Sequence, residues 1–219
     1  MNHIDINTYI INLYATGTAA NSIGHINQVL ARALAIKGTA LNEAEFFAIT
    51  LHDCAVKARG GVKDNHALWG AGIAVMFLRS LGKSEQLIAE IERAILAHDP
   101  LGQRVGIHDS FTSELLAAAD ESAPDVGFIM NKSYVWNRRK RGKNHADAVE
   151  AVTNYMRSMY GSYSKDYLPA LYFSYYGSRV TEMSEICSQL TEEKTEEILS
   201  EFRARNNLGP DDMGLGEAA

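Results

Sequence analysis

The segment from Ala44 to Lys57 places a histidine and an aspartate side by side where an apolar run ends. Its sequence is AEFFAITLHDCAVK, so that His52 and Asp53 follow a stretch of mainly apolar residues. A charged group that is buried without a partner is costly, and such groups are normally paired or coordinate a metal ion. The segment therefore predicts that His52 and Asp53 have binding partners, either other side chains or a metal ion.

Further histidines stand at or near the ends of predicted helices in the first half of the chain. The chain has seven histidines, and three of them are followed directly by aspartate. Of these three pairs, only His52-Asp53 follows a long apolar run. His25, His66 and His98 are the further candidates. Imidazole and carboxylate groups together suit divalent ions such as Mn, Fe, Zn, Co or Mg.

The elements that must position these side chains are predicted to be helices. Apolar residues recur with helical period nearly throughout the chain, and no run alternates as a half-buried strand does. Asn42 with Glu45 three residues later forms a capping-box pattern, and Gly82 is typical of the residue just past a helix end. The predicted fold class is all-α. The helices expected in the first half are 6–15, 23–36, 42–53, 66–81, 84–98 and one from 110 that ends around 120–123.

Composition changes after Pro124, which predicts a second part of the chain. A basic segment, 128–143, contains Arg138-Arg139-Lys140-Arg141-Gly142-Lys143 and is predicted to be a loop. Three helices are expected at 146–160, 165–176 and 191–205. The expected organisation is a core over 1–124, a helical extension packed on it over 125–206 and a flexible tail over 207–219. Tyrosines crowd the extension, where they would pack a core or the face of a homodimer.

Composition and charge narrow the class of protein. The chain has 219 residues, 46% of them hydrophobic, and a net charge of −6. No apolar run reaches the roughly 20 residues that a membrane span needs, and the N-terminus shows no signal-peptide pattern. Cys54 and Cys187 form no disulfide framework, so a cytoplasmic location is expected. The acidic balance argues against a general nucleic-acid binder.

Five segments in order resemble those of the HD-domain superfamily of metal-dependent phosphohydrolases. They are GHINQVLARALA, FFAITLHDCA, HALWGAGIAVMFLRSLG, IERAILAHD and ELLAAADE, and the resemblance covers about residues 20–123. It implies an HD-type helical bundle with one or two divalent metal ions. The metal ligands that it implies are His25, His52, Asp53 and Asp120, with His66 and His98 holding a second ion that Asp53 bridges.

For His66 and His98 a structural role stays open beside metal binding. His66 could cap the helix that it begins. His98 could interact with the negative end of the dipole of the helix that it ends.

The function that the resemblance implies is hydrolysis of a nucleotide or a related small phosphate ester or anhydride. The metal would lower the pKa of its bound water to make a nucleophile, which Asp53 would orient or deprotonate. Some HD enzymes carry a lysine three residues beyond the aspartate, and Lys57 lies four beyond Asp53. Despite this difference of one residue, Lys57 is the candidate for a catalytic and substrate-binding lysine. It would neutralise charge on the transferring phosphoryl group.

Four further basic residues are candidates for binding the anionic substrate. Arg59 and Lys63 flank a Gly60-Gly61 loop just beyond the His52-Asp53 pair, and Arg138 and Arg139 follow in the basic run. Closely spaced guanidinium groups bind phosphates well. The alternative for these four residues, and for Lys57, is a solvated loop charge.

Two other functions stay open. Some proteins with a similar six-ligand pattern are di-iron oxygenases, for which iron content and oxygen uptake, rather than phosphate release, would be diagnostic. The third function is a regulatory module that binds a nucleotide without turnover, which binding without product would indicate. An intact ligand set argues against this last function.

Overall fold

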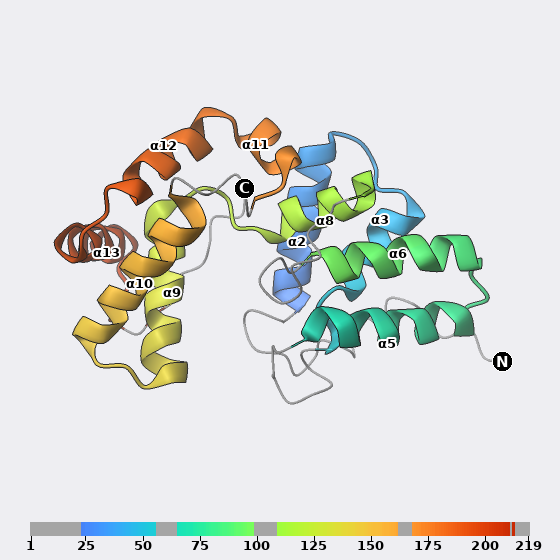
Figure 1. Ribbon diagram of the computed structural model, residues 1–219, viewed down its shortest axis with the longest axis horizontal. Helices are drawn as coiled ribbons and strands as arrows, with labels where there is room; N and C mark the ends of the chain where they lie inside the picture. The colour runs from blue at the N-terminus through green and yellow to red at the C-terminus, as the bar shows by residue number, and fades with distance from the viewer. Residues whose placement is uncertain (1–22, 56–64, 99–108, 162–167, 211, 213–219) are drawn as a thin grey trace. The chain divides into compact units, whose positions relative to one another are not determined.

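The computed structural model describes residues 23–55, 65–98, 109–161, 168–210 and 212. Within these residues helices are the regular elements and no strand occurs, which confirms the predicted all-α class (Figure 1). The predicted helix 6–15 lies outside the described residues. No helix in the described ranges is long and apolar enough to cross a membrane.

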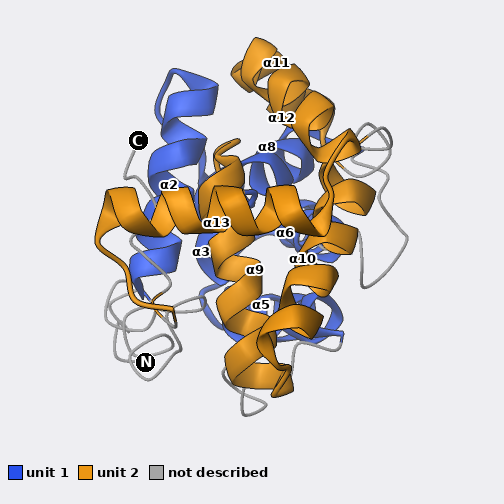
Figure 2. Ribbon diagram, turned by 90° about the vertical axis from the view of Figure 1, so that its left-hand side faces the viewer, with its two compact units in different colours: residues 1–121, 219 blue, residues 122–218 orange. Residues whose placement is uncertain are grey.

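The chain divides into two compact units (Figure 2). Unit 1 lies within residues 1–121 and contains α2 (Ile23–Lys37), α3 (Glu43–Leu51), α5 (His66–Ser80), α6 (Glu85–Ala97) and α8 (Phe111–Asp120). Unit 2 lies within residues 122–218 and contains α9 (Val126–Arg141), α10 (His145–Tyr160), α11 (Ala170–Tyr176), α12 (Ser178–Ser188) and α13 (Glu192–Asn206).

Unit 1 is a bundle in which α6 and α8 are central. Helix α5 packs along α6, α2 packs along α8, and α3 contacts both α6 and α8. Fully buried aliphatic side chains from facing helices, such as Ile49, Leu51, Ile91 and Leu115, fill the space between them. This packing brings the ends of helices far apart in sequence into one region.

Helix α3 begins at the predicted capping box. The Asn42 side chain accepts a hydrogen bond from the backbone N–H of Glu45 at 2.9 Å, and the Glu45 carboxylate accepts one from the Asn42 N–H at 2.7 Å. The helix ends at Leu51, so His52 and Asp53 lie in the turn that follows. Buried residues on almost every position of α3 hold this turn inside unit 1.

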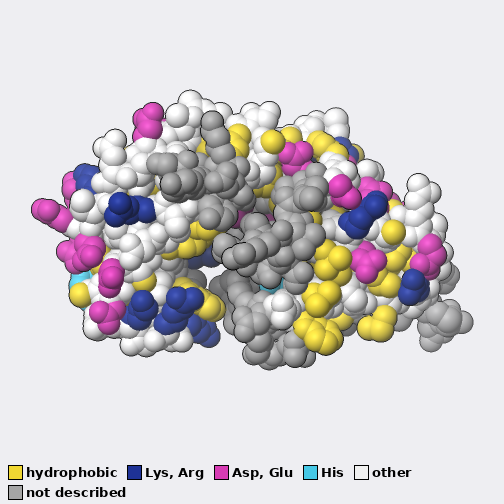
Figure 3. Space-filling view, viewed as in Figure 1, with side chains coloured by type: hydrophobic (Ala, Val, Ile, Leu, Met, Phe, Trp, Pro, Cys, Tyr) yellow, Lys and Arg dark blue, Asp and Glu magenta, His cyan; other side chains and the backbone are white. Residues whose placement is uncertain are grey.

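Helix α9 corrects the prediction of a loop over 128–143. Asp125 caps its start by accepting from the Phe128 N–H at 2.8 Å, and Gly142 ends it with φ of +64°. Buried Met130 and Tyr134 give it an apolar side. Its basic residues occupy the last turn, where positive charge complements the helix dipole. Figure 3 shows Lys and Arg side chains gathered where α9 ends.

Unit 2 also contains a helix that the sequence patterns did not predict. Helix α12 buries Val180, Met183 and Cys187. The predicted helix 165–176 is shorter in the structure, where α11 begins at Ala170 after Pro169, and residues 165–167 lie outside the described residues. The tyrosines that are buried pack the core of unit 2, and the Tyr172 hydroxyl donates to the Ser122 carbonyl at 2.7 Å. Residues 213–219 of the predicted tail lie outside the described residues.

Candidate metal centre

Every described helix of unit 1 brings one candidate ligand, or an adjacent pair, to the same place. His25 lies in the first turn of α2, and His52-Asp53 forms the turn after α3. His66 begins α5, His98 follows the last residue of α6, and Asp120 ends α8; these residues complete the cluster. These side chains lie at or near helix ends that are far apart in sequence. They come together because the helices of unit 1 pack against one another.

His25, His52 and Asp120 form the first half of the cluster. The His25 and His52 Nε2 atoms lie 3.4 Å apart. Asp120 Oδ1 lies 3.1 Å from the His25 Nε2 and 3.4 Å from the His52 Nε2. All three donor atoms therefore point at one another.

His66 and His98 form the second half. Their Nε2 atoms lie 3.1 Å apart, and the rings meet edge to face with centroids 5.0 Å apart. Both nitrogens face the same carboxylate oxygen, Asp53 Oδ1, at 3.5 Å from His66 and 4.0 Å from His98. The side chains are therefore turned toward the cluster.

Asp53 stands between the two halves, with one oxygen toward each. Its Oδ2 lies 3.7 Å from the Nε2 atoms of both His25 and His52, whereas Oδ1 faces His66 and His98. A carboxylate that turns one oxygen to each of two donor sets has the arrangement of a bridging ligand. Sequence order alone could not assign the two oxygens.

Backbone carbonyls fix the orientation of two of the imidazoles. The Nδ1–H of His52 donates to the Ile49 carbonyl at 2.7 Å, and that of His98 donates to the Ile95 carbonyl at 2.5 Å. The last carbonyls of a helix have no partner within it, so they are available for such bonds. When the imidazole is neutral, Nε2 carries the lone pair in this tautomer, and both rings turn Nε2 toward the cluster.

Burial and neighbouring charges shift the pKa values of three members of the cluster. Burial lowers the pKa of His52, but the charges of Asp53 and Asp120 with hydrogen bonding outweigh burial and raise this pKa to about 9. Burial, followed by the charge of His52, lowers the pKa of His98 to about 4. Burial opposes ionisation of Asp120, but the charge of His52 with hydrogen bonds from His25 and His52 holds its pKa well below the usual range.

The cluster differs in exposure from one side to the other. The side chains of His52 and His98 are 0% and 1% exposed, whereas that of Asp120 is 28% exposed. The buried histidines therefore form the floor of the centre, and the Asp120 side is the more accessible to solvent.

Two contacts that sequence patterns missed support the ligands from outside the cluster. Arg32 Nε donates to the Ala119 carbonyl at 2.6 Å, which ties the end of α8 beside Asp120 to α2. Gly70 lets α5 approach the His52 turn, since a Cβ at this position would lie 2.9 Å from the His52 carbonyl oxygen. The glycine in an otherwise helical pattern is the one sequence signal of this approach.

The donor set fits divalent metal. Three overlapping groups can each hold an ion with donor atoms within 4.8 Å of one another: His25, His52 and Asp53; His52, His98 and Asp120; and Asp53, His66 and His98. Imidazole nitrogens with carboxylate oxygens suit borderline and hard divalent ions. A bound cation would also balance the two carboxylates that the bundle encloses, a balance that buried charge requires.

Only some of the basic residues that were predicted to bind substrate lie within the described residues. Lys57, Arg59 and Lys63 lie outside the described residues. Arg138 and Arg139 belong to the last turn of α9 in unit 2, where Arg138 donates to the Lys143 carbonyl at 2.8 Å. Their role in substrate binding stays a prediction.

The order of the clustered residues along the chain is the order on which the resemblance to the HD-domain superfamily rests. That resemblance stays a prediction about the family. The chain matches no protein-family model, no curated protein and no solved structure.

Proposed function

We propose that unit 1 is the catalytic centre of an HD-type, metal-dependent phosphohydrolase. Its substrate would be a nucleotide or a related small phosphate ester or anhydride. The observation that carries the proposal is the position of Asp53, whose two oxygens face two separate sets of imidazole nitrogens. In two-metal hydrolytic centres the ions stand only about 3.5–4 Å apart, so one carboxylate can bind both.

In this proposal His25, His52 and Asp120 would hold one divalent ion, and His66 and His98 would hold the other. Asp53 would be the ligand common to both ions. When bound, divalent metal supplies a coordinated water of lowered pKa and polarises phosphoryl oxygens. The donor set of this chain is compatible with Mn, Fe, Co, Zn or Mg, and its nitrogen content favours the transition metals over Mg.

Neighbouring backbone groups hold two of the proposed metal ligands in position. Ile49 and Ile95 hold His52 and His98 through their Nδ1–H groups, so the donor atoms need little rearrangement when substrate arrives. The buried floor keeps bulk water away and strengthens charge interactions inside the centre. Substrate would approach on the more exposed Asp120 side.

Charge supports a small anionic substrate over a long nucleic acid. The whole chain carries a net charge of −6, which would repel an extended polyanion. Lys57, Arg59 and Lys63 are close in sequence to Asp53 and would neutralise the charge of a phosphoryl group. A compact phosphate ester can reach such a local positive region without bringing its whole length against the acidic surface.

The test is phosphate release by the full chain from a panel of nucleotides and small phosphate esters. The chain is first stripped with a chelator and dialysed, then supplied separately with Mn, Co, Zn, Mg or anaerobic Fe. We expect no release without metal and release from at least one compound with metal. Absence of release with every metal would contradict the proposal, and oxygen uptake with Fe under the same conditions would assign the centre to oxidative chemistry.

A further inference from the structure

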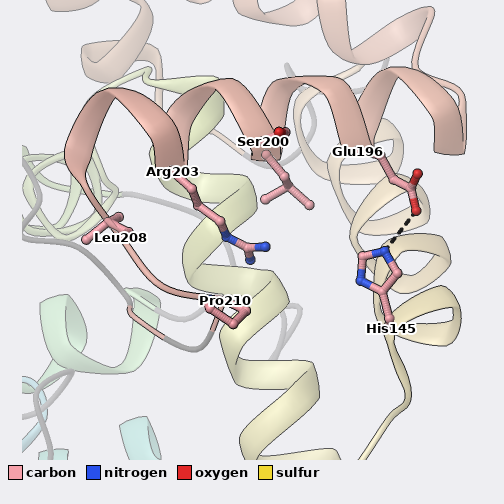
Figure 4. Close-up of a pocket in the computed structure, with 7 residues that line it drawn as sticks. His145, Glu196, Ser200, Arg203, Leu208 and Pro210 are labelled. Carbon is pink, nitrogen blue, oxygen red and sulfur yellow. Dashed lines mark hydrogen bonds and ion pairs between the residues drawn. The ribbon is translucent and has the colours of Figure 1, made fainter.

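We infer that unit 2 carries a second binding site, for a small molecule with one oxyanionic group, carboxylate or phosphoryl, beside an apolar part. The site is a pocket of about 380 Å³ lined by α13, by the start of α10 and by the segment that follows α13 (Figure 4). All of its lining residues belong to unit 2, so this inference stands apart from the metal centre.

Arg203 provides the positive charge of the pocket. Its Nε donates to the Asn131 side-chain oxygen at 2.8 Å, and its guanidinium carbon lies 4.2 Å from the centroid of the Tyr134 ring. No carboxylate within the described ranges forms an ion pair with Arg203, and its Nη2 is buried without a hydrogen-bond partner. A guanidinium has five N–H donors and keeps its charge at any ordinary pH. The positive charge of Arg203 is therefore without an ion-pair partner among the described residues, and an anion in the pocket would match it.

The surroundings hold Arg203 in place before any ligand binds. Asn131 is fully buried, and its Nδ2 donates to the Asp212 carbonyl at 2.8 Å, which ties the segment after α13 to α9. The Leu208 N–H donates to the Arg203 carbonyl at 3.0 Å, which fixes the beginning of the same segment. A preorganised site loses less conformational freedom on binding, so its contacts contribute more to affinity.

A chain of hydrogen bonds fixes the opposite wall. With the hydrogen of the imidazole on Nε2, the Tyr134 hydroxyl donates to His145 Nδ1 at 2.8 Å and His145 Nε2 donates to Glu196 Oε1 at 3.0 Å. Tyr134 thus contacts both the guanidinium and the imidazole. Figure 4 shows His145 and Glu196 joined at one side of the pocket and Arg203 pointing into it from α13.

The remaining lining residues define the ligand chemistry. Ser200 precedes Arg203 by three residues on α13, so both side chains project on one side of the helix, and the hydroxyl can donate to a second anion oxygen. Leu199, Leu208 and Pro210 offer apolar surface beside them. Glu196 lies two turns from Arg203, and its carboxylate disfavours a ligand with several negative charges. A ligand with one oxyanionic group joined to an apolar body would bind the Arg203 and Ser200 donors, cover the apolar surface and avoid strong repulsion by Glu196.

The test titrates the isotope-labelled full chain, freed of metal and chelator so that the metal centre cannot hold the probes. Benzoate serves as the carboxylate probe and phenylphosphonate as the phosphoryl probe, and the backbone amide signals of Ser200 and Leu208 are followed by NMR. We expect saturable shifts with at least one probe, and the probe that binds identifies the anionic group. No saturable shift with either probe would overturn the inference.

Two variants and a control separate the pocket from general charge effects. Arg203→Gln should weaken binding roughly tenfold to a hundredfold, as expected for the loss of a charged hydrogen-bonding partner. Arg205→Gln removes the same charge from an exposed position of the same helix and should leave the dissociation constant unchanged. Equal weakening by both substitutions would mean nonspecific attraction and would overturn the inference.

Ser200→Glu tests the same pocket while keeping the Arg203 side chain. Ser200 is exposed, so the substitution leaves the Asn131 and Tyr134 contacts intact and places a carboxylate beside the anion. Binding should again weaken by roughly tenfold or more, because the new carboxylate and the anionic probe repel each other at close range. If Arg203→Gln fails to fold, Ser200→Glu decides alone, and unchanged binding in this variant would exclude the pocket.

Discussion

Asp53 is the residue on which the metal centre depends, because its two carboxylate oxygens face the two halves of the cluster. Asp53→Asn keeps the size of the side chain but removes its charge. We expect bound metal to fall and phosphate release to drop by at least about a hundredfold, since even outer-shell partners of a metal ligand are worth about 10–100-fold. Metal analysis and initial rates on the same preparation would measure both effects.

Asp109→Asn is the matched control for this substitution. Asp109 also follows a histidine directly, but its side chain is 45% exposed and lies 3.7 Å from Arg93 on the surface of unit 1. Metal content and rate should stay at the native level in this variant. Equal losses in both variants, or native activity in Asp53→Asn, would be incompatible with a bridging role for Asp53.

The pKa of His52 makes metal binding depend on pH. In the metal-free protein this pKa is raised to about 9, so near neutral pH the imidazole carries a proton that metal must displace. His98, with its pKa lowered to about 4, carries no such proton. Metal affinity should therefore rise as pH increases toward about 9.

Calorimetry in buffers of different ionisation enthalpy would count the protons released on metal binding. We expect the count to be higher by about one at pH 7.5 than at about pH 10, where His52 is already neutral. The same count at both pH values would show that metal does not displace a proton from His52.

At the residue scale, sequence patterns could select the clustered side chains but not their geometry. The apolar run before His52-Asp53 and the order of the other histidines carry local information. Which oxygen of Asp53 faces which imidazoles depends on how α5 and α6 pack against the turn after α3, and no local pattern encodes that packing. The support from Arg32 and Gly70 was missed for the same reason.

At the scale of elements, Gly70 permits the close approach of α5 to the ligand turn, the turn after α3 that contains His52 and Asp53. Gly70→Ala would place a Cβ 2.9 Å from the His52 carbonyl oxygen, so α5 must move away from the turn. We expect the free energy of unfolding to fall by about 1–3 kcal/mol, as in other overpacked cores, together with weaker metal binding. Urea unfolding and metal titration would measure the two changes.

Gly72→Ala in the same helix is the control, and we expect it to stabilise the protein rather than destabilise it. A Cβ at Gly72 would have nothing within 4 Å, so only helix propensity changes. The free energy of unfolding should rise by about 0.5–1 kcal/mol with metal affinity unchanged. If both alanine variants behaved alike, the approach of α5 to the ligand turn would not be what Gly70 permits.

Several of the helices that were predicted from sequence begin at a clear capping residue. Helix α3 has its capping box at Asn42, and α6 and α8 have Ser84 and Ser110 at their starts. Helix α9 was predicted to be a loop because its basic residues dominate its composition, while its buried side faces neighbouring helices of unit 2. Helix α12 was missed because only Val180, Met183 and Cys187 form its apolar side.

At the scale of the whole molecule, the basic end of α9 is the predicted substrate-binding feature of unit 2. Reversal of charge at Arg138 and Arg139 to Glu should raise KM for a nucleotide substrate severalfold and leave metal binding unchanged. The effect should shrink at high salt, since exposed charges are screened over about 10 Å at 0.1 M. Steady-state kinetics at two salt concentrations would show it.

The same reversal at Arg157 and Arg205, which are both exposed, changes the net charge of unit 2 equally. KM should change little in this double variant. An unchanged KM after substitution of Arg138 and Arg139, or an equal rise in both double variants, would remove the basic end of α9 from substrate binding.

The most direct test of the metal centre is anomalous X-ray scattering from crystals of the full chain grown with Mn²⁺. Two anomalous peaks about 3.5–4 Å apart are expected, with Asp53 between them. His25, His52 and Asp120 should surround one peak, and His66 and His98 the other. A single peak, or Mn²⁺ bound away from Asp53 in crystals saturated with the ion, would contradict a two-metal centre.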